Sequence, residues 1–291
     1  MKLRGYLLAL VSAVSYGLIP LFILPVKALN FPLDTTLFYR FFISALFILA
    51  FLIYKKESLR VNKNEFLILL VLGLLYALSS DCLFLGYSLL TPGIASTVLF
   101  VYPVFVALIL ALFFKEKITR FTFFSLLITF SGILVLSTNG SSFNINFPGL
   151  LVCVLCALFY AVYMVIVNKS GMKVSGIKIT FYSMLFSAVY YLVKTILMDE
   201  PLIASPALIL HISVFALVTT VFSITALIYA IQYIGSTPTS IMGALEPVIA
   251  IMISVCCFGE TLTWNLTLGV ILILTGVIFN MVFDTKEQKA L

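Results

Sequence analysis

Glu246 is the residue of this sequence best placed to do chemistry, because it stands inside a long apolar run and directly precedes Pro247. Proline has no backbone N–H and disrupts a helix about one turn earlier, which would free a carbonyl near Gly243. A carboxylate beside a broken helix can bind a cation or an ammonium group, or take up a proton. The alternative is a structural glutamate whose hydrogen bonds join neighbouring helices. We favour the binding role.

Ser79, Ser80 and Asp81 form a second polar interruption of apolar sequence. Ionisable residues inside apolar helices are costly and often mark a pathway or a site. Either a water-filled cavity or a salt bridge to Arg40 would explain Asp81, so its functional and structural interpretations stay equally open. Arg40 is expected to extend toward the membrane interface or to pair with another side chain, rather than to bind substrate.

Tyrosines well inside apolar runs are the third group of candidates. The hydroxyl of a buried tyrosine needs a hydrogen-bond partner, and its ring can stack on an organic molecule. Simple helix packing is the alternative for each of them. With the polar residues above, the tyrosines complete a predicted substrate-binding set of Tyr16, Ser79, Asp81, Tyr102, Tyr160, Tyr229 and Glu246, and the predicted gating set is Pro103, Pro247 and Gly243.

The elements that carry these residues are long and apolar. Of the 291 residues, 63% are hydrophobic and 10% are charged, whereas soluble domains have about 45–50% apolar and ~25% charged residues. Lipid must therefore be the solvent for most of the chain, and long continuous apolar runs satisfy their backbone polar groups in lipid only as helices. The sequence predicts ten transmembrane helices, near residues 4–25, 34–54, 66–90, 92–114, 120–138, 147–167, 177–198, 206–231, 236–258 and 263–283.

The lysines and arginines orient these helices. If the N-terminus is cytoplasmic, 14 of the 17 basic residues fall at the cytoplasmic side, as the positive-inside rule requires. This bias predicts a multi-pass protein of the inner or plasma membrane with both termini in the cytoplasm. It also accounts for the net charge of +6 without nucleic acid. The residues are Lys2, Arg4, Lys55, Lys56, Arg60, Lys63, Lys115, Lys117, Arg120, Lys169, Lys173, Lys178, Lys286 and Lys289.

The sequence also matches itself at a constant offset of 144 residues. This offset predicts a duplicated five-helix unit, residues 1–143 and 144–291. Because five is odd, the second unit enters the membrane from the opposite side, and the fold class is an all-α membrane protein of two inverted-topology five-helix repeats. Inverted repeats are the recurrent build of secondary transporters, although a duplication could simply make a stable bundle. Matched positions include Gly5 and Gly149, Tyr16 and Tyr160, Pro103 and Pro247, Glu116 and Glu260, and Gly132 and Gly276.

One segment of the second repeat resembles a known family. Residues 230–276 contain Ala230, Ile234-Gly235, Ser240, Glu246-Pro247-Val248, Gly259-Glu260-Thr261-Leu262, Gly269 and Gly276. This pattern resembles the second repeat of EamA-type transporters of the drug/metabolite transporter superfamily. The first repeat matches more loosely, through Ser96, Tyr102-Pro103-Val104, Glu116 and Gly132.

The resemblance implies a bacterial-type inner-membrane carrier, often an exporter of amino acids or related metabolites. It also implies a central cavity lined by spans from both halves. It names no substrate, because members of the family carry chemically different cargoes. Tyr102 stands where the second repeat has Glu246, so a symmetric site with two carboxylates is not available.

Two other classes of protein fit the sequence less well. A membrane-embedded enzyme would need paired carboxylates or several metal ligands, and the sequence has a single histidine and no P-loop. A channel or a receptor without transport coupling is the other alternative, although no ring of charge is seen. We therefore expect a secondary active transporter, not an enzyme, that exports a small organic metabolite by alternating access. The expected partners are that substrate, the lipid bilayer and protons as candidate coupling ions, with no cofactor, metal or nucleic acid, and we expect a monomer.

Overall fold

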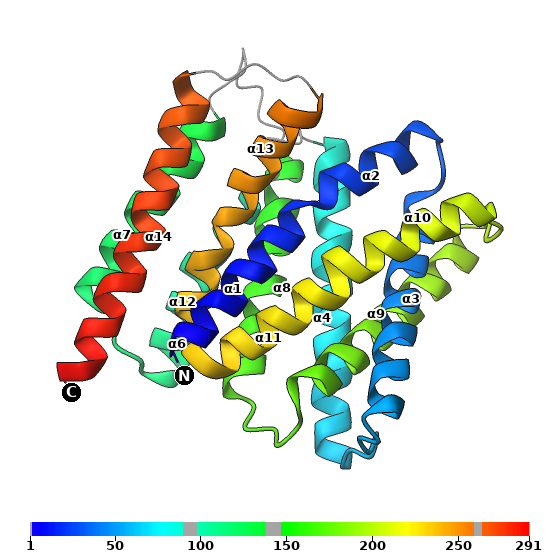
Figure 1. The fold of residues 1–291 in the computed structure, drawn as a ribbon, viewed down its shortest axis with the longest axis horizontal. Helices are drawn as coiled ribbons and strands as arrows, with labels where there is room; N and C mark the ends of the chain where they lie inside the picture. The colour runs from blue at the N-terminus through cyan, green and yellow to red at the C-terminus, as the bar shows by residue number, and fades with distance from the viewer. Residues whose placement is uncertain (1, 90–97, 138–146, 259–263, 291) are drawn as a thin grey trace.

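The computed structural model of the chain consists of helices that run between two opposite edges of the molecule (Figure 1). It describes residues 2–89, 98–137, 147–258 and 264–290. Both ends of the chain lie at one edge, called the N-terminal edge below, and the other is called the opposite edge (Figure 1). The elements are α1 (Lys2–Gly17), α2 (Ile19–Ala28), α3 (Leu33–Tyr54), α4 (Lys63–Leu89), α6 (Tyr102–Phe114), α7 (Arg120–Ser137), α8 (Phe147–Lys169), α9 (Gly176–Leu197), α10 (Pro206–Ala216), the π-helix η1 (Leu217–Phe222), α11 (Ser223–Ile234), α12 (Ser236–Gly243), α13 (Leu245–Phe258) and α14 (Trp264–Ala290).

Six helices within the described residues are long and apolar enough to cross a membrane. Large apolar side chains on their outer faces are exposed, among them Leu67, Leu151 and Val189. Lipid covers such a surface without cost, whereas water does not. The prediction of an all-α, multi-pass membrane protein is confirmed. The six spans are Lys2–Ile23, Leu33–Tyr54, Lys63–Gly86, Phe147–Lys169, Gly176–Leu197 and Pro206–Ile234.

The first span, Lys2–Ile23, falls within the predicted range 4–25 apart from its ends, but its α-helix is broken at Leu18. Helix α1 ends at Gly17 and α2 begins at Ile19, with Pro20 as its second residue. Proline is favourable in the first turn of a helix, where its missing N–H costs no hydrogen bond. Part of the predicted span at 92–114 lies outside the described residues, and its last 13 residues form α6.

The contacts between helices recur when the two halves of the chain are exchanged. At the 144-residue offset, α1, α4 and α6 correspond to α8, α10–α11 and α13. The contact between α4 and α8 corresponds to the contact between α11 and α1. The contact between α6 and α8 corresponds to the contact between α13 and α1. The Ser79 hydroxyl donates to the Cys156 carbonyl oxygen over 3.1 Å. The Ser223 hydroxyl donates to the Ser12 carbonyl oxygen over 3.1 Å. Both the two donors and the two acceptors are 144 residues apart, so the internal repeat holds at the level of single hydrogen bonds.

Helices α7 and α14, which also correspond at this offset, lie side by side (Figure 1). A Cβ on Gly132 would stand 2.8 Å from the Gly269 carbonyl oxygen, and one on Gly276 would stand 3.1 Å from the Ser125 carbonyl oxygen. Adding 144 to Gly132 gives Gly276, and subtracting 144 from Gly269 gives Ser125, so each contact is the equivalent of the other across the repeat. Rising numbers in α7 meet falling numbers in α14, so the pair is antiparallel. The backbones approach so closely that only glycine fits at Gly132 and Gly276.

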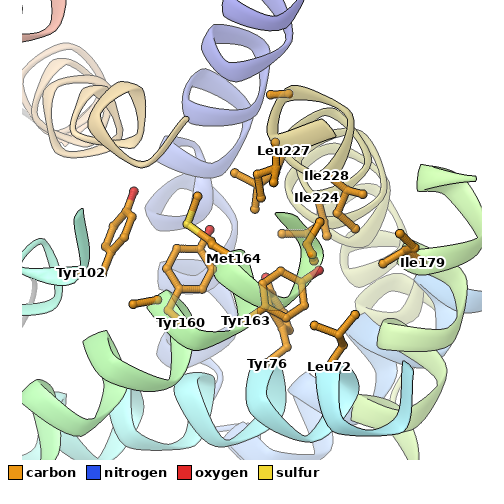
Figure 2. Packing of buried hydrophobic residues seen from close by; sticks show 14 of the residues in the cluster. Leu72, Tyr76, Tyr102, Tyr160, Tyr163, Met164, Ile179, Ile224, Leu227 and Ile228 are labelled. Atoms are coloured by element: carbon orange, nitrogen blue, oxygen red, sulfur yellow. The ribbon is translucent and has the colours of Figure 1, made fainter. Parts of the chain in front are cut away.

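Tyrosines occupy the centre of the bundle. Tyr76, Tyr102, Tyr163 and Tyr191 are among the largest side chains that are fully buried. Figure 2 shows Tyr76, Tyr102 and Tyr160 approaching one another from three different helices, α4, α6 and α8. Tyrosines in a membrane protein interior bring both aromatic surface and hydroxyl groups to the same place.

Candidate functional site

A small cavity of about 20 Å³, room for about one water molecule, lies among these tyrosines. It is lined by residues of α1, α4, α6, α8 and α13 and by Leu99, so both halves of the chain contribute to it. Tyr76 and Tyr160 stand near the middle of α4 and α8, which puts the cavity well inside the bundle. Five of the predicted substrate-binding residues line it: Tyr16, Ser79, Tyr102, Tyr160 and Glu246. The rest of the lining consists of Tyr76, Ser80, Leu83, Leu99 and Cys156.

Glu246 is the charged residue of this lining. Its residue is only 7% exposed, and among the described residues no hydrogen bond or salt bridge reaches its carboxyl group. It is the second residue of α13, directly after the interruption at Ala244. The free N–H groups at the start of a helix favour an anion there. The site therefore holds a buried acidic group without a positive partner among the described residues.

The interruption before α13 is where Pro247 led us to expect it, because α12 ends at Gly243. Gly243 is in close contact with α6: a Cβ at this position would collide with the Tyr102 hydroxyl and would stand 3.5 Å from a carboxyl oxygen of Glu246. The Tyr102 hydroxyl donates to the Ser240 carbonyl oxygen over 3.2 Å. Tyr102 and Glu246 occupy matched positions of the two repeats, and both side chains lie close to Gly243.

The tyrosine rings around the cavity are set at steep angles to one another. Tyr102 and Tyr160 have centroids 4.9 Å apart and planes at 81°. Tyr76 and Tyr160 have centroids 6.4 Å apart and planes at 57°. Rings at such angles present both edges and faces to the space between them.

Tyr76 is the main lining residue that the sequence analysis missed. It precedes Ser79 and Ser80 by three and four residues on one helix, a spacing that puts all three on the same face. The polar pair could therefore have identified the tyrosine. Cys156 also lines the cavity and was not among the predicted site residues. Its thiol donates to the Ser79 carbonyl oxygen over 3.0 Å.

Asp81 does not line this cavity. Its carboxylate forms a salt bridge with Lys194 and accepts a hydrogen bond of 2.8 Å from the Tyr190 hydroxyl. The same ammonium group lies 3.2 Å from Oδ1 of Asp34. The salt bridge to Arg40 that we considered from the sequence is not formed. Helix α9 packs against α3, which carries Asp34, and against α4, which carries Asp81. Lys194 of α9 therefore lies close to both carboxylates.

Arg40 is bound by the π-helix η1 instead. Its Nε donates to the Thr220 hydroxyl over 2.7 Å, and its guanidinium carbon lies 4.6 Å from the centroid of the Phe215 ring. The residue is buried and makes no salt bridge within the described part of the chain. Of the two expectations, extension toward the interface or pairing, the structure has Arg40 bound to a hydroxyl and not to an acid. Arg40 does not line the cavity, but its guanidinium carbon lies 5.8 Å from the ring centroid of Tyr16, which does.

Tyr229 also lies away from the cavity. Its ring packs against the first residue of α9, where a Cβ on Gly176 would lie 3.0 Å from the ring. Pro103 and Pro247 each stand in the first turn of a helix, α6 and α13. Their gating role, like that of Gly243, stays a prediction.

A multi-pass membrane protein whose two similar halves enclose a polar cavity has the build of a membrane transporter. The chain matches the EamA-like transporter family twice, over residues 3–138 and 147–282. It belongs to this family, within the drug/metabolite transporter superfamily, which confirms the resemblance and the expectation that it is not an enzyme. One match lies within residues 1–143 and the other within residues 144–291, the two segments predicted as repeats.

Related proteins match most of the length of the chain at low sequence identity. The chain is 25% identical over 252 residues to the uncharacterized transporter YdfC of Bacillus subtilis (strain 168), covering 86% of this chain and 82% of the relative. It is 25% identical over 265 residues to the S-adenosylmethionine uptake transporter of Rickettsia bellii (strain RML369-C), covering 87% and 84%. A solved crystal structure matches with a TM-score of 0.81 at 18% identity and covers 98% of this chain and 99% of its own, which shows a shared fold.

Proposed function

We propose that the protein is a secondary active transporter that moves a small organic metabolite through the cavity around Glu246 by alternating access. Its two moving units are the inverted five-helix halves, residues 1–143 and 144–291, which together supply ten spans. The observation that carries the proposal is the pair of matched contacts between the halves, Ser79 to Cys156 and Ser223 to Ser12, together with a cavity to which both halves contribute. Two halves with equivalent contacts can exchange shapes, and that exchange opens a central site to each side in turn.

Ion pairs between the halves fit such an exchange. Asp34 and Asp81 of the first half meet Lys194 of the second, and Glu116 of the first half meets Lys169 of the second. The Glu116–Lys169 pair borders a cavity of about 300 Å³ at the N-terminal edge. The Lys194 group lies toward the opposite edge, because α9 runs away from the N-terminal edge (Figure 1). Opening either edge would break the pair at that edge and leave the other intact.

The distribution of basic residues supports a cytoplasmic position for the N-terminal edge. The family resemblance favours export of an amino acid or a related metabolite. One relative is named as an uptake transporter for S-adenosylmethionine, which is itself an amino-acid derivative. We therefore keep an amino acid or a related compound as the substrate class and export as the direction to be measured.

The test is solute counterflow in proteoliposomes. Vesicles loaded with a high concentration of one unlabelled amino acid or derivative are diluted into the same labelled compound at low concentration. A carrier that alternates accumulates label transiently above equilibrium, because each return step brings a labelled molecule inward. Vesicles without protein serve as the control. Label that only equilibrates would indicate a channel and would overturn the proposal, as would the absence of protein-dependent flux across the full panel.

A further inference from the structure

A second cavity, called the edge cavity below, lies at the N-terminal edge beside the Glu116–Lys169 ion pair (Figure 1). Its volume is about 300 Å³, at the lower end of the range for small-molecule sites, about 300–1,000 Å³. Residues of α6, α7, α8, α11 and α12 contribute to its lining, so both halves of the chain take part. In this structure an organic molecule therefore fits at the N-terminal edge and not in the central cavity of about 20 Å³.

Two helices connect the edge cavity with the central cavity. In α6, Tyr102 lines the central cavity and Ala107 lines the edge cavity, and five residues of α-helix span about 7.5 Å. Helix α12 begins with Ser236 in the edge cavity and ends at Gly243, which lies against Tyr102. The Tyr102 hydroxyl donates to the carbonyl oxygen of Ser240 in the same helix. The edge cavity therefore leads toward the central cavity, and the contact between Tyr102 and α12 separates them.

Charges of both signs line the edge cavity. Within the described lining they are Glu116, Lys117 and Lys169. The side chains of Glu116 and Lys169, which pair the two halves, are 43% and 30% exposed. Exposed pairs of this kind contribute little to stability, because water screens both charges. Lys117 forms no salt bridge within the described part of the chain. The lining thus holds a pair that can be broken at low cost, with a further lysine beside it.

Neutral residues complete the lining. Asn168 and Ser236 both line the cavity, and the Asn168 amide donates to the Ser236 hydroxyl over 3.1 Å. Leu110, Ile118 and Ile234 supply aliphatic surface. Ligand sites combine apolar surface with a few polar groups that fix the orientation of the ligand. The edge cavity has this composition, and it suits a small molecule that carries both charges and an apolar part.

We propose that the edge cavity is a loading site for zwitterionic amino acids, whose two charged groups replace the Glu116–Lys169 ion pair. The ammonium group of the ligand binds Glu116, its carboxylate binds Lys169 and Lys117, and its side chain lies against the aliphatic residues. The halves lose their ion pair as the ligand binds, which frees this edge to move. A ligand with a single charge leaves Glu116 or Lys169 without a partner and binds less well. This inference rests on the proposed function, because it places a second site on the same transport route.

The first experiment compares an amino acid with two molecules that each lack one of its charged groups. Leucine, serine and phenylalanine are titrated into the purified protein in a calorimeter, and the tightest binder is compared with its decarboxylated amine and its deaminated acid. For leucine these analogues are isoamylamine and isocaproate. We expect the amino acid to bind about three- to tenfold more tightly than either analogue, a modest factor because water screens the charges. Equal binding of all three compounds would overturn the inference.

Two variants test the exchange of partners. Glu116→Gln removes the partner of the ammonium group and frees Lys169, so the amino acid should bind about three- to tenfold more weakly while the acid analogue binds more tightly. Lys169→Gln should weaken the amino acid in the same way and favour the amine analogue. A purely structural role of the pair would shift all three ligands in one direction, and that result would contradict the inference. Lys173→Gln is the control, because Lys173 is exposed and outside the lining, and it should change none of the affinities.

A bulky substitution locates the ligand. Thr237 lines the edge cavity on α12 and is partly exposed, so Thr237→Trp should fill part of the space and weaken binding of all three compounds. Thr275→Trp makes the same change on an exposed face of α14 outside the lining and should leave binding unchanged. Thermal unfolding shows that each variant is folded. Full binding by a folded Thr237→Trp protein would place the ligand elsewhere and overturn the inference.

The outcomes also separate this inference from the proposed function. If none of the three amino acids binds but counterflow is found with another compound, the loading site is wrong and the transporter stands. If amino acids bind with the expected dependence on Glu116 and Lys169 but show no counterflow, the binding site stands and alternating access is wrong.

Discussion

Asp81 and Glu246 are both acidic residues within apolar helices, yet their surroundings are opposite. Asp81 has a salt bridge to Lys194 and a hydrogen bond from Tyr190, and it lies outside the central cavity. Glu246 lines that cavity with neither kind of partner among the described residues. An acid whose partner is built into the fold joins helices, whereas an acid without one is available to a ligand or a proton. Burial alone does not separate the two roles, but the presence of a partner does.

The comparison predicts its largest effect at Lys194. Lys194→Met would leave Asp81 and Asp34 facing each other without a shared cation, so the free energy of unfolding should fall by about 2–3 kcal/mol. This is below the ~3–5 kcal/mol of a fully buried pair, because about a quarter of the Lys194 side chain is exposed. Thermal or denaturant unfolding in detergent would measure the loss.

The matched control for that variant is Glu246→Gln. Removing an unpaired buried charge takes nothing from the fold, so the stability of this variant should be unchanged or higher. If Glu246→Gln destabilised the protein as much as Lys194→Met does, Glu246 would be a structural residue like Asp81, and the contrast between them would be lost.

The next effect concerns the backbone beside Glu246. Gly243→Ala places a methyl group against the Tyr102 hydroxyl, so we expect a loss of about 1–2 kcal/mol from overpacking. Adding Tyr102→Phe removes the hydroxyl and should restore at least half of the loss, although the Ser240 carbonyl then loses its donor. The unfolding midpoints of the two single variants and the double variant form the measurement. Additive losses in the double variant would show that the two residues do not meet as described.

Much of the central site could be predicted from sequence, because depth in an apolar run and the repeat offset both depend only on position along the chain. Tyr16, Tyr160 and Glu246 were found in this way. Tyr229 was misplaced because its position along the helix does not fix which way the side chain faces, and its ring faces α9. The partner of Asp81 was misassigned because Lys194 is 113 residues away and reaches it only through the packing of α9 on α4.

The smallest predicted effect sharpens the comparison between the two repeats themselves. Ser79→Ala and Ser223→Ala each delete a hydroxyl that donates to a carbonyl oxygen over 3.1 Å at matched positions. Each should cost about 0.5–1.5 kcal/mol, and the two costs should agree within about 0.5 kcal/mol, since each hydroxyl makes one neutral hydrogen bond to a carbonyl oxygen and a second contact with the side chain of the same partner residue. Binding should separate them, because Ser79 lines the cavity and Ser223 does not. We expect weaker ligand binding in Ser79→Ala and unchanged binding in Ser223→Ala, measured with the ligand found by counterflow. Equal effects on binding would mean that the hydrogen bonds position the helices for transport as a symmetric pair, and that Ser79 has no separate part in the site.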